Sequence, residues 1–429
     1  MAGPVVPGGW ARVRDNGAVR ELAESEILLR GRVVTPTDVL EDGLLVTRGA
    51  TITWIGPADR APAPWSERLP ETSDDTVLPG LVDVHCHGGG GASFPDATTA
   101  DEVATAAAEH LRHGTTTLVA SLVTAPREAL LARTALLADA AEAGVVAGIH
   151  LEGPFLSHAR CGAQNPGDML PGDAALVDAV AEAARGHLVT MTVAPEVAGV
   201  VGVDGDDDVL SALVRGGALP SVGHTDASAA QVEAAVDRSF DLLAAAPAAR
   251  SGRPTATHLF NGMRPVHHRD PGPVLACLAA AARGELVVEL VADGTHLDPA
   301  TVVAVFDLVG ADAVVLVTDA MAAAGMADGD YQLGPMAVRV ADGVARIVDS
   351  DGLPGAIAGG VAHLLDVVRA TVGAGVPVVD AVRAASLTPA SVLGLTDVGG
   401  LVAGLRADVL VVDDELRPRL VLRAGVPVE

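Results

Sequence analysis

The stretch 81–87 reads Leu81-Val82-Asp83-Val84-His85-Cys86-His87, a short apolar run that ends in two histidines before the glycines 88–91. Later apolar runs end in the same manner at Glu152, His224, His258 and Asp319. Parallel (β/α)8 barrels keep their catalytic groups at the C-terminal ends of the strands, on one rim. These five strand ends therefore predict one site on the rim of a barrel.

The sequence around this stretch alternates between strand, loop and helix patterns. Strand candidates occupy the ranges 81–87, 115–123, 145–152, 188–194, 218–223, 254–258, 286–292 and 313–319. Ala-rich helical stretches follow most of them, for example at 100–113, 127–143, 174–185, 228–237 and 300–309. Eight such units predict an α/β fold, a (β/α)8 TIM-type barrel. The Gly-rich segment 325–360 delays the last helix and is predicted to be a hairpin or a lid.

The two ends of the chain have the pattern of a small β domain. Short β-rich runs separated by turn residues fill the region 21–78, and similar runs recur at 408–412 and 420–425. We expect 21–78 and 396–429 to pair into one small β-sandwich domain. The barrel domain would then span 79–395, and residues 1–20 would be a loose N-terminal extension.

Composition excludes several classes of partner. The formal net charge is −27 and the pI is about 4.7, which argues against nucleic acid and anionic membranes as partners. No apolar run approaches the roughly 20 residues of a membrane span. Three cysteines without framework spacing, and a start without a signal-peptide pattern, favour the reducing cytoplasm.

The chain contains no lysine, so all 28 of its basic side chains other than histidine are arginine. The absence of lysine excludes a Schiff-base mechanism, a P-loop and a carboxylated lysine that bridges two metals. Any bridging ligand would have to be a carboxylate such as Glu152.

The residue types at the strand ends predict a metal site. His85 and His87 point to the same face of a strand, because side chains alternate along it. Imidazole and carboxylate ligands suit Zn²⁺ or a related divalent ion. Asp319 is the candidate acid and base for a metal-bound water. The plainer alternatives are solvated or core histidines, an ion pair or helix cap at Glu152, and a fifth-ligand role for Asp319.

These motifs together resemble the amidohydrolase superfamily and, within it, the N-acetylglucosamine-6-phosphate deacetylase family. The matching segments run in family order across roughly 79–390 and comprise 79–89, 150–155, 194–196, 223–225, 257–263, 267–272, 292–296 and 317–320. The terminal β domain also matches. Jointly these segments form a specific signature, although His-x-His alone does not.

The resemblance implies a hydrolase that converts N-acetyl-D-glucosamine 6-phosphate to glucosamine 6-phosphate and acetate in amino sugar catabolism. Glu152, His224 and His258 would hold the principal metal, most readily Zn²⁺. His85 and His87 would bind a second ion, giving one or two ions per subunit. A metal-bound hydroxide would attack the acetamide, with Asp319 as general base and acid.

The resemblance also assigns a phosphosugar pocket. Asn261 and the Gly262 backbone would meet the phosphate or nearby sugar oxygens, and His296 would contact the sugar phosphate end. Arg269 would reach the phosphate in the neighbouring subunit, which implies a homodimer. The planar donors of arginine match phosphate geometry, although an ordinary surface loop of mixed charge remains the alternative reading of Arg269.

The chain departs from the family pattern at two places. Gln164 stands where the family has a histidine that contacts substrate near the amide, and Ile357-Ala358-Gly359-Gly360 replaces a Leu-Ala-Gly-Ser type of segment that lines the acetyl pocket. Cys161 lies on the same loop as Gln164. Gln164 and Gly360 therefore leave open an amidohydrolase that acts on a different N-acyl amino sugar or small amide. An alternative of another class is a non-catalytic scaffold that kept the barrel.

Overall fold

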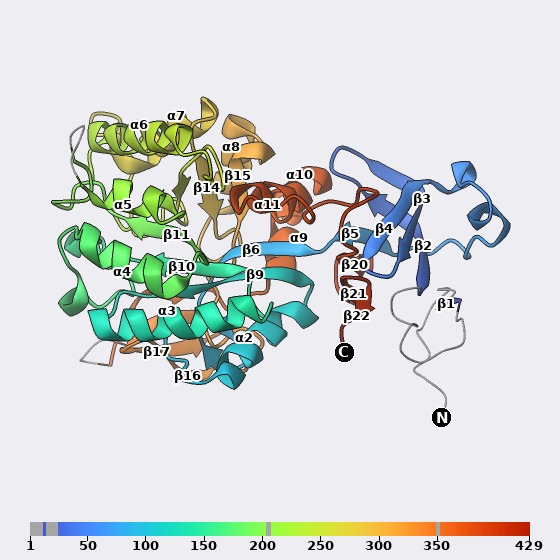
Figure 1. The fold of residues 1–429 in the computed structure, drawn as a ribbon, viewed down its shortest axis with the longest axis horizontal. Coiled ribbons are helices and arrows are strands. Elements are labelled where there is room, and N and C mark those ends of the chain that lie inside the picture. The colour runs from blue at the N-terminus through green and yellow to red at the C-terminus, as the bar shows by residue number, and fades with distance from the viewer. Residues whose placement is uncertain (1–11, 14–24, 203–206, 349–351) are drawn as a thin grey trace.

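The computed structural model describes residues 12–13, 25–202, 207–348 and 352–429. A helix-covered barrel lies on one side of Figure 1, and a smaller β domain lies on the other. The predicted extension 1–20 lies outside the described residues except for β1 (Arg12–Val13), which pairs antiparallel with β2. No helix among the described residues is both long and apolar enough to cross a bilayer.

The barrel contains one sheet of eight parallel strands, as the sequence predicts. In sheet order the strands are β15 (Val314–Leu316), β14 (Val287–Leu290), β13 (Thr255–Ala256), β12 (Leu219–Val222), β11 (Leu188–Val193), β10 (Gly148–Glu152), β9 (Thr115–Leu122) and β6 (Leu81–Cys86). Every strand residue is buried, which is typical of a parallel sheet covered on both faces.

Helices cover the outside of this sheet. They are α2 (Ala100–Arg112), α3 (Arg127–Glu142), α4 (Ala174–Ala184), α5 (Val209–Arg215), α6 (Ala229–Ala245), α7 (Gly272–Ala282), α8 (Pro299–Val309), α9 (Leu364–Ala374), α10 (Val378–Ala384) and α11 (Leu387–Val392). Capping boxes at Thr99 and Ser228 fix the starts of α2 and α6, because their side chains satisfy free backbone N–H groups.

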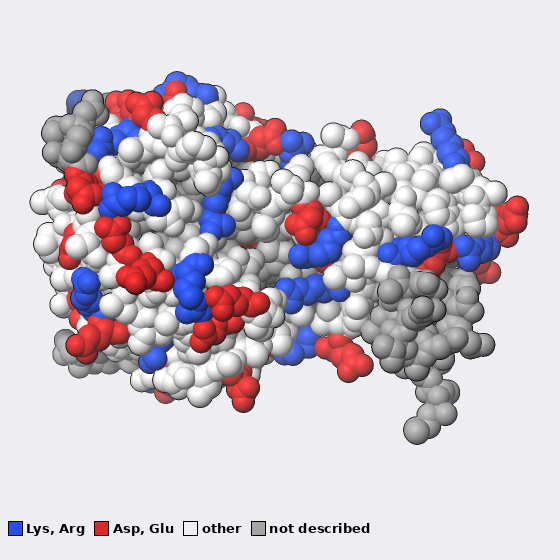
Figure 2. All heavy atoms as spheres, in the orientation of Figure 1, with Lys and Arg blue, Asp and Glu red and all other residues white. Residues whose placement is uncertain are grey.

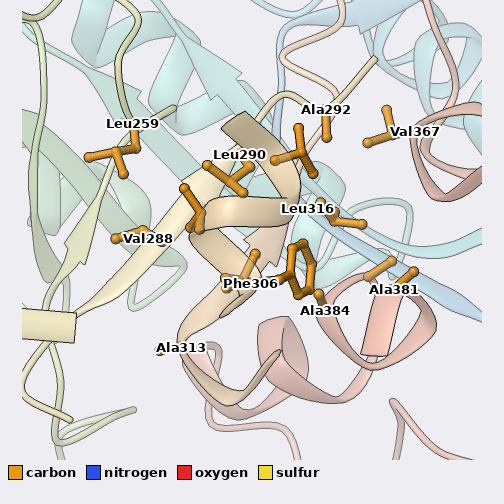
Figure 3. Close-up of a cluster of buried hydrophobic side chains, with 14 of the residues drawn as sticks. Leu259, Val288, Leu290, Ala292, Phe306, Ala313, Leu316, Val367, Ala381 and Ala384 are labelled. Carbon is orange, nitrogen blue, oxygen red and sulfur yellow. The ribbon is translucent and has the colours of Figure 1, made fainter. Parts of the chain in front are cut away.

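Small side chains fill much of the core, since aromatics are only 2% of the chain. Figure 3 shows Leu290 and Leu316 from the sheet beside Phe306 of α8 and Ala381 and Ala384 of α10. Alanine at these positions allows the helices to approach the sheet closely. The Ala-rich composition thus still yields large buried apolar clusters.

The barrel closes between its first and last strands without a regular ladder. A single bridge joins Cys86 to Ala320. The Asp319 backbone N–H donates to the carbonyl of His85 at 2.9 Å, and the Thr318 hydroxyl donates to the Asp83 carboxylate at 2.6 Å. Residues just past the end of β15 therefore close the gap to β6, and we call this gap the seam.

Strands from both ends of the chain form the small domain, as predicted. They are β22 (Val426–Pro427), β21 (Pro418–Arg423), β20 (Val409–Val412), β5 (Thr76–Pro79), β2 (Glu26–Val34), β3 (Val39–Arg48) and β4 (Thr51–Pro57), in sheet order. Leu28 and Leu29 lie in different apolar clusters, as expected when alternate side chains face opposite sides of one sheet.

The Gly-rich segment that follows β15 in the chain forms a sheet of its own. It contains β16 (Gly329–Leu333), β17 (Met336–Ala341), β18 (Val344–Val348) and β19 (Pro354–Gly359), all antiparallel. We call these four strands the insert. The prediction of a hairpin or lid thus covered the right segment and underestimated its size.

The remaining elements are short. They comprise β7 (Gly88–Gly89), β8 (Ala92–Ser93), η1 (Ala58–Arg60), η2 (Trp65–Glu67), η3 (His158–Arg160), η4 (Pro166–Asp168) and η5 (Ala311–Ala313). Basic and acidic side chains are interspersed on the face of the molecule in Figure 2. Among the surface ion pairs, Arg185 pairs with Glu142 and Arg215 with Asp178.

Candidate metal centre

The six residues predicted at the strand ends meet in two adjoining groups. Nε2 of His224 and Nε2 of His258 lie 2.9 and 2.8 Å from Oε1 of Glu152, and we call these three residues the glutamate group. Nε2 atoms of His85 and His87 each lie 3.3 Å from Oδ1 of Asp319, and these three residues are the aspartate group.

The two groups touch through Glu152. Its second oxygen, Oε2, lies 3.4 Å from Nε2 of His87. All six side chains are largely buried, and Asp319 is the most accessible of the carboxylates at 15%. The strand ends thus bring six potential ligands into one buried place.

The backbone at three of these positions is left-handed. The φ angles are 45° at His224, 27° at His258 and 47° at Asp319, each just beyond a strand. Residues other than glycine rarely adopt such φ angles, and each residue held in this conformation costs on the order of 1–3 kcal/mol. The fold holds this strain where the strands turn into loops, and strain of this kind clusters at functional sites.

The hydrogen bonds of His224 determine which of its nitrogens carries the proton. Its Nδ1 lies 2.7 Å from the carbonyl oxygen of Arg160, and a carbonyl can only accept. Nδ1 therefore donates, and neutral His224 directs the lone pair of Nε2 at Glu152. Two acceptors facing each other at 2.9 Å require a proton or a cation between them.

The same reasoning applies to His85. Its Nδ1 lies 3.0 Å from Oε2 of Glu289, so Nδ1 donates and the lone pair of Nε2 points into the aspartate group. Metal-binding histidines commonly donate their other N–H to a carboxylate or carbonyl in this way. The sequence reasoning missed Glu289, although a lone carboxylate in the buried run Val287-Val288-Glu289-Leu290 is a usable signal.

The electrostatics of the site favour a cation. Burial lowers the pKa of His87, but its contacts with Asp319 and Glu152 outweigh burial and raise that pKa to about 10. Burial raises the pKa of Glu152, yet His224 and His258 hold it well below its usual range. Burial likewise raises the pKa of Asp319, but His85 and the neighbouring histidines outweigh burial, and the pKa of Asp319 is also lowered.

No arginine lies among these contacts within the described chain, so histidines alone balance the carboxylates. Imidazole nitrogens with lone pairs directed at carboxylate oxygens are the donor set that Zn²⁺ and related ions prefer. The residues of both groups therefore fit divalent cations.

Gln164 lies beside the glutamate group. Its side-chain N–H donates to Oε2 of Glu152, and its Oε1 accepts from the Thr124 backbone N–H at 2.8 Å. Gln164 is buried, so both ends of its amide are committed within the protein. The expected contact with substrate stays a prediction.

The other predicted binding residues lie around the site or on the surface. Gly262 has a φ of 59°, and a Cβ there would lie 2.8 Å from Nδ1 of His224, so only glycine fits. Asn261 donates to the carbonyl of His258, and the Gly360 N–H donates to the carbonyl of Asp319 at 2.7 Å. Nδ1 of His296 lies 2.9 Å from Asp293.

Arg269 is exposed, and its guanidinium has no hydrogen bond or ion pair within the described parts of the chain. It lies in an exposed loop that also contains His267 and His268. This arrangement leaves the Arg269 guanidinium available to an anion.

A third histidine cluster lies outside the metal centre. Nε2 of His363 lies 3.0 Å from Glu109, and the rings of His113 and His363 stack at 3.6 Å with an angle of 11° between them. A metal ion lies close to the plane of each imidazole that binds it, so two stacked parallel rings cannot share one ion in this arrangement. We interpret this cluster as structural.

Comparison with known proteins gives a consistent result. The sequence model of the amidohydrolase family matches residues 76–426. N-acetylglucosamine-6-phosphate deacetylase of Bacillus subtilis (strain 168) is 32% identical over 337 residues, which cover 76% of this chain and 78% of the relative. N-acetylgalactosamine-6-phosphate deacetylase of Escherichia coli O157:H7 is 31% identical over 91% of this chain and 96% of the relative.

A solved structure resembles the whole chain. It is a mutant N-acetyl-D-glucosamine-6-phosphate deacetylase from Mycobacterium smegmatis in complex with N-acetyl-D-glucosamine-6-phosphate. The TM-score is 0.83 and the sequence identity is 40%, over 94% of this chain and 99% of that one.

Proposed function

The chain belongs to the amidohydrolase family, among the N-acetylglucosamine-6-phosphate deacetylases, and we propose that it releases acetate from N-acetyl-D-glucosamine 6-phosphate. It is a hydrolase, and glucosamine 6-phosphate would be the second product. The observation that carries the proposal is the convergence of histidine lone pairs and carboxylate oxygens in the glutamate and aspartate groups.

We propose one or two zinc ions as the cofactor. The glutamate group would hold one ion, and His85, His87 and Asp319 would hold the other. A bound divalent ion supplies a Lewis acid for the carbonyl and lowers the pKa of water from about 15.7 towards about 7. Glu289 orients His85 and the Arg160 carbonyl orients His224, so these two ligands would be positioned before an ion arrives.

Asp319 is the acid and base in this proposal. Its lowered pKa keeps it ionised at neutral pH, so it can accept a proton from water that attacks the acetamide carbonyl. It then returns the proton to the amine nitrogen as the C–N bond breaks. Its carboxylate is the most exposed of the ligands at 15%, as a group that meets substrate needs to be.

The sugar phosphate would bind around the loop that follows His258. Asn261 and the Gly262 backbone adjoin the glutamate group, and His296 is oriented by Asp293. The exposed Arg269 would bind the phosphate of the neighbouring subunit's substrate in a homodimer. All three cysteines are free, in keeping with a cytoplasmic location, which is also part of the proposal.

Subunit mixing tests the shared site. Arg269→Ala and Asp319→Asn proteins are each expected to have low activity as homodimers. Co-refolded mixtures should regain activity, because one of the two sites in a mixed dimer then holds both native residues. Mixtures no more active than the average of their parents would argue against the shared site.

The direct test is acetate release by the purified protein. Its substrates are N-acetylglucosamine 6-phosphate, its unphosphorylated form and N-acetylgalactosamine 6-phosphate, each with and without chelator. Chelator-sensitive turnover confined to the first substrate is expected. Preference for the galactosamine epimer or another N-acyl sugar would favour the alternative raised by Gln164 and Gly360. Purified protein without stoichiometric metal would revive the scaffold alternative.

A further inference from the structure

Gln164 is held by two hydrogen bonds that leave its amide little freedom. Its Oε1 accepts from the Thr124 N–H at the end of β9, and its Nε2 donates to Oε2 of Glu152 at the end of β10. The Thr124 hydroxyl in turn donates to the backbone carbonyl of Glu152 at 3.1 Å. The side chain therefore ties two neighbouring strand ends together, and it is only 3% exposed.

The two oxygens of Glu152 consequently have different surroundings. Oε1 faces His224 and His258 within 2.9 Å, whereas Oε2 receives the Gln164 N–H and lies 3.4 Å from His87. Oε2 is the oxygen with which Glu152 could bridge to an ion in the aspartate group. Donation from Gln164 withdraws electron density from Oε2 and occupies one of its lone-pair directions.

We propose that Gln164 is a positioning residue. By bonding to Oε2 it limits Glu152 to an ion in the glutamate group, and it thereby weakens ion binding in the aspartate group. This inference rests on the proposed metal centre. It predicts two ions of unequal affinity, with the ion in the glutamate group held more tightly. Exchange of ions in the aspartate group would then be tuned by a residue that binds no metal itself.

Metal titration of the apoprotein tests this proposal. Two successive Zn²⁺ dissociation constants are measured by calorimetry, and the zinc retained after dialysis against a chelator of intermediate strength is counted. Gln164→Leu removes the donor with little change in volume. Gln164→Met also removes the donor and has a similar length without adding a charge, and it serves if the leucine variant does not fold. Asn165→Ala is the matched control, since Asn165 lies on the same loop and bonds to Asp168 instead.

Both Gln164 variants are expected to tighten the second ion, so that the ratio of the two constants falls about tenfold or more, the scale of effects seen for residues around metal ligands. The Asn165 variant should keep the native ratio. An unchanged ratio, or a parallel weakening of both ions, would overturn the positioning role and leave the metal centre intact. Native protein that binds no zinc would overturn the metal centre and this inference together.

Discussion

Asp319 combines features that the proposed chemistry needs in one residue. Its carboxylate lies 3.3 Å from two imidazoles, stays ionised and remains partly accessible. Asp319→Asn keeps the shape and one oxygen ligand but removes the ability to take a proton. We expect kcat to fall by about 10²–10⁴-fold, the usual contribution of general acid–base catalysis. Steady-state kinetics with metal analysis checks this, and near-native turnover at full metal content would contradict it.

His110 makes a separate prediction about stability and pH. The side chain is fully buried, and desolvation lowers its pKa to about 4. Between that value and the unfolded pKa of about 6.5, the unfolded chain binds a proton that the folded protein does not. The free energy of unfolding must therefore fall as the pH drops through this window, by up to about 3 kcal/mol.

Urea unfolding from pH 7.5 to 4.5 measures this effect. His110→Gln can still donate to the Gly88 carbonyl, which His110 contacts at 2.8 Å, but it cannot titrate. The Gln variant should lose less stability across the window than the native protein. Glu109, His113 and His363 act on the pKa of His110 and are present in both proteins, so only the difference between the two profiles reports on His110. Parallel profiles would refute the assignment.

Sequence reasoning pointed to the six residues of the glutamate and aspartate groups because they lie at the ends of apolar runs, and it could not show how they pair. Gln164 was expected to face substrate, and its bond to Glu152 depends on how the loop at 161–165 folds back over β9 and β10. Such a contact leaves no local pattern. Glu289 lies inside a strand rather than at its end, so a search confined to strand ends passed over it.

At the scale of elements, the insert is held near its ends by one carboxylate. Glu109 of α2 bonds to His363, three residues past Gly360, and a Cβ on Gly325 would lie 2.1 Å from its Oε1. Glu109 thus packs against residues just outside both ends of the insert. Gly360, just after the C-terminal end of the insert, also donates to the backbone carbonyl of Asp319, so this end of the insert adjoins the proposed catalytic residue.

We therefore predict that His363→Ala loosens the insert. Amide hydrogen exchange in β16–β19 should accelerate, while exchange in the barrel strands stays near native, because local opening requires only the local contacts to break. Arg369→Ala is the control on the same helix, since Arg369 pairs with Asp366 at the surface, where ion pairs contribute about 0–1 kcal/mol. Equal effects of the two substitutions would argue against a special role for His363.

The eight barrel strands were predictable at this scale because each is a β-rich apolar run bounded by turn residues. A last helix after the segment 325–360 was predicted, and α9 lies there, whereas the ranges of α5, α7, α10 and α11 were not predicted. The four strands of the insert were not predicted individually. Exposed and buried residues alternate along β17 and β18 only over short stretches, and glycines interrupt the pattern. Partners in a small antiparallel sheet are chosen by tertiary packing, which sequence alone does not display.

At the scale of the whole molecule, a bound ion would contribute to global stability. An ion that binds only the folded chain stabilises it by about 4 kcal/mol when its free concentration is 1,000 times its dissociation constant. Chelator should therefore lower the melting temperature of the native protein. A protein with Glu152→Gln and His258→Asn should show a smaller chelator effect, because only an ion in the aspartate group could still bind. A chelator effect as large as that of the native protein would place the stabilising ion elsewhere.

The seam between β6 and β15 ties metal binding to the order of events in folding. His85 and His87 lie on one side of it and Asp319 on the other, so a chain whose barrel is still open has no complete aspartate group. An ion that spans this gap fastens the barrel only after the strands have met. Added zinc should then leave the refolding rate unchanged and slow unfolding, because interactions absent from the transition state act on unfolding alone.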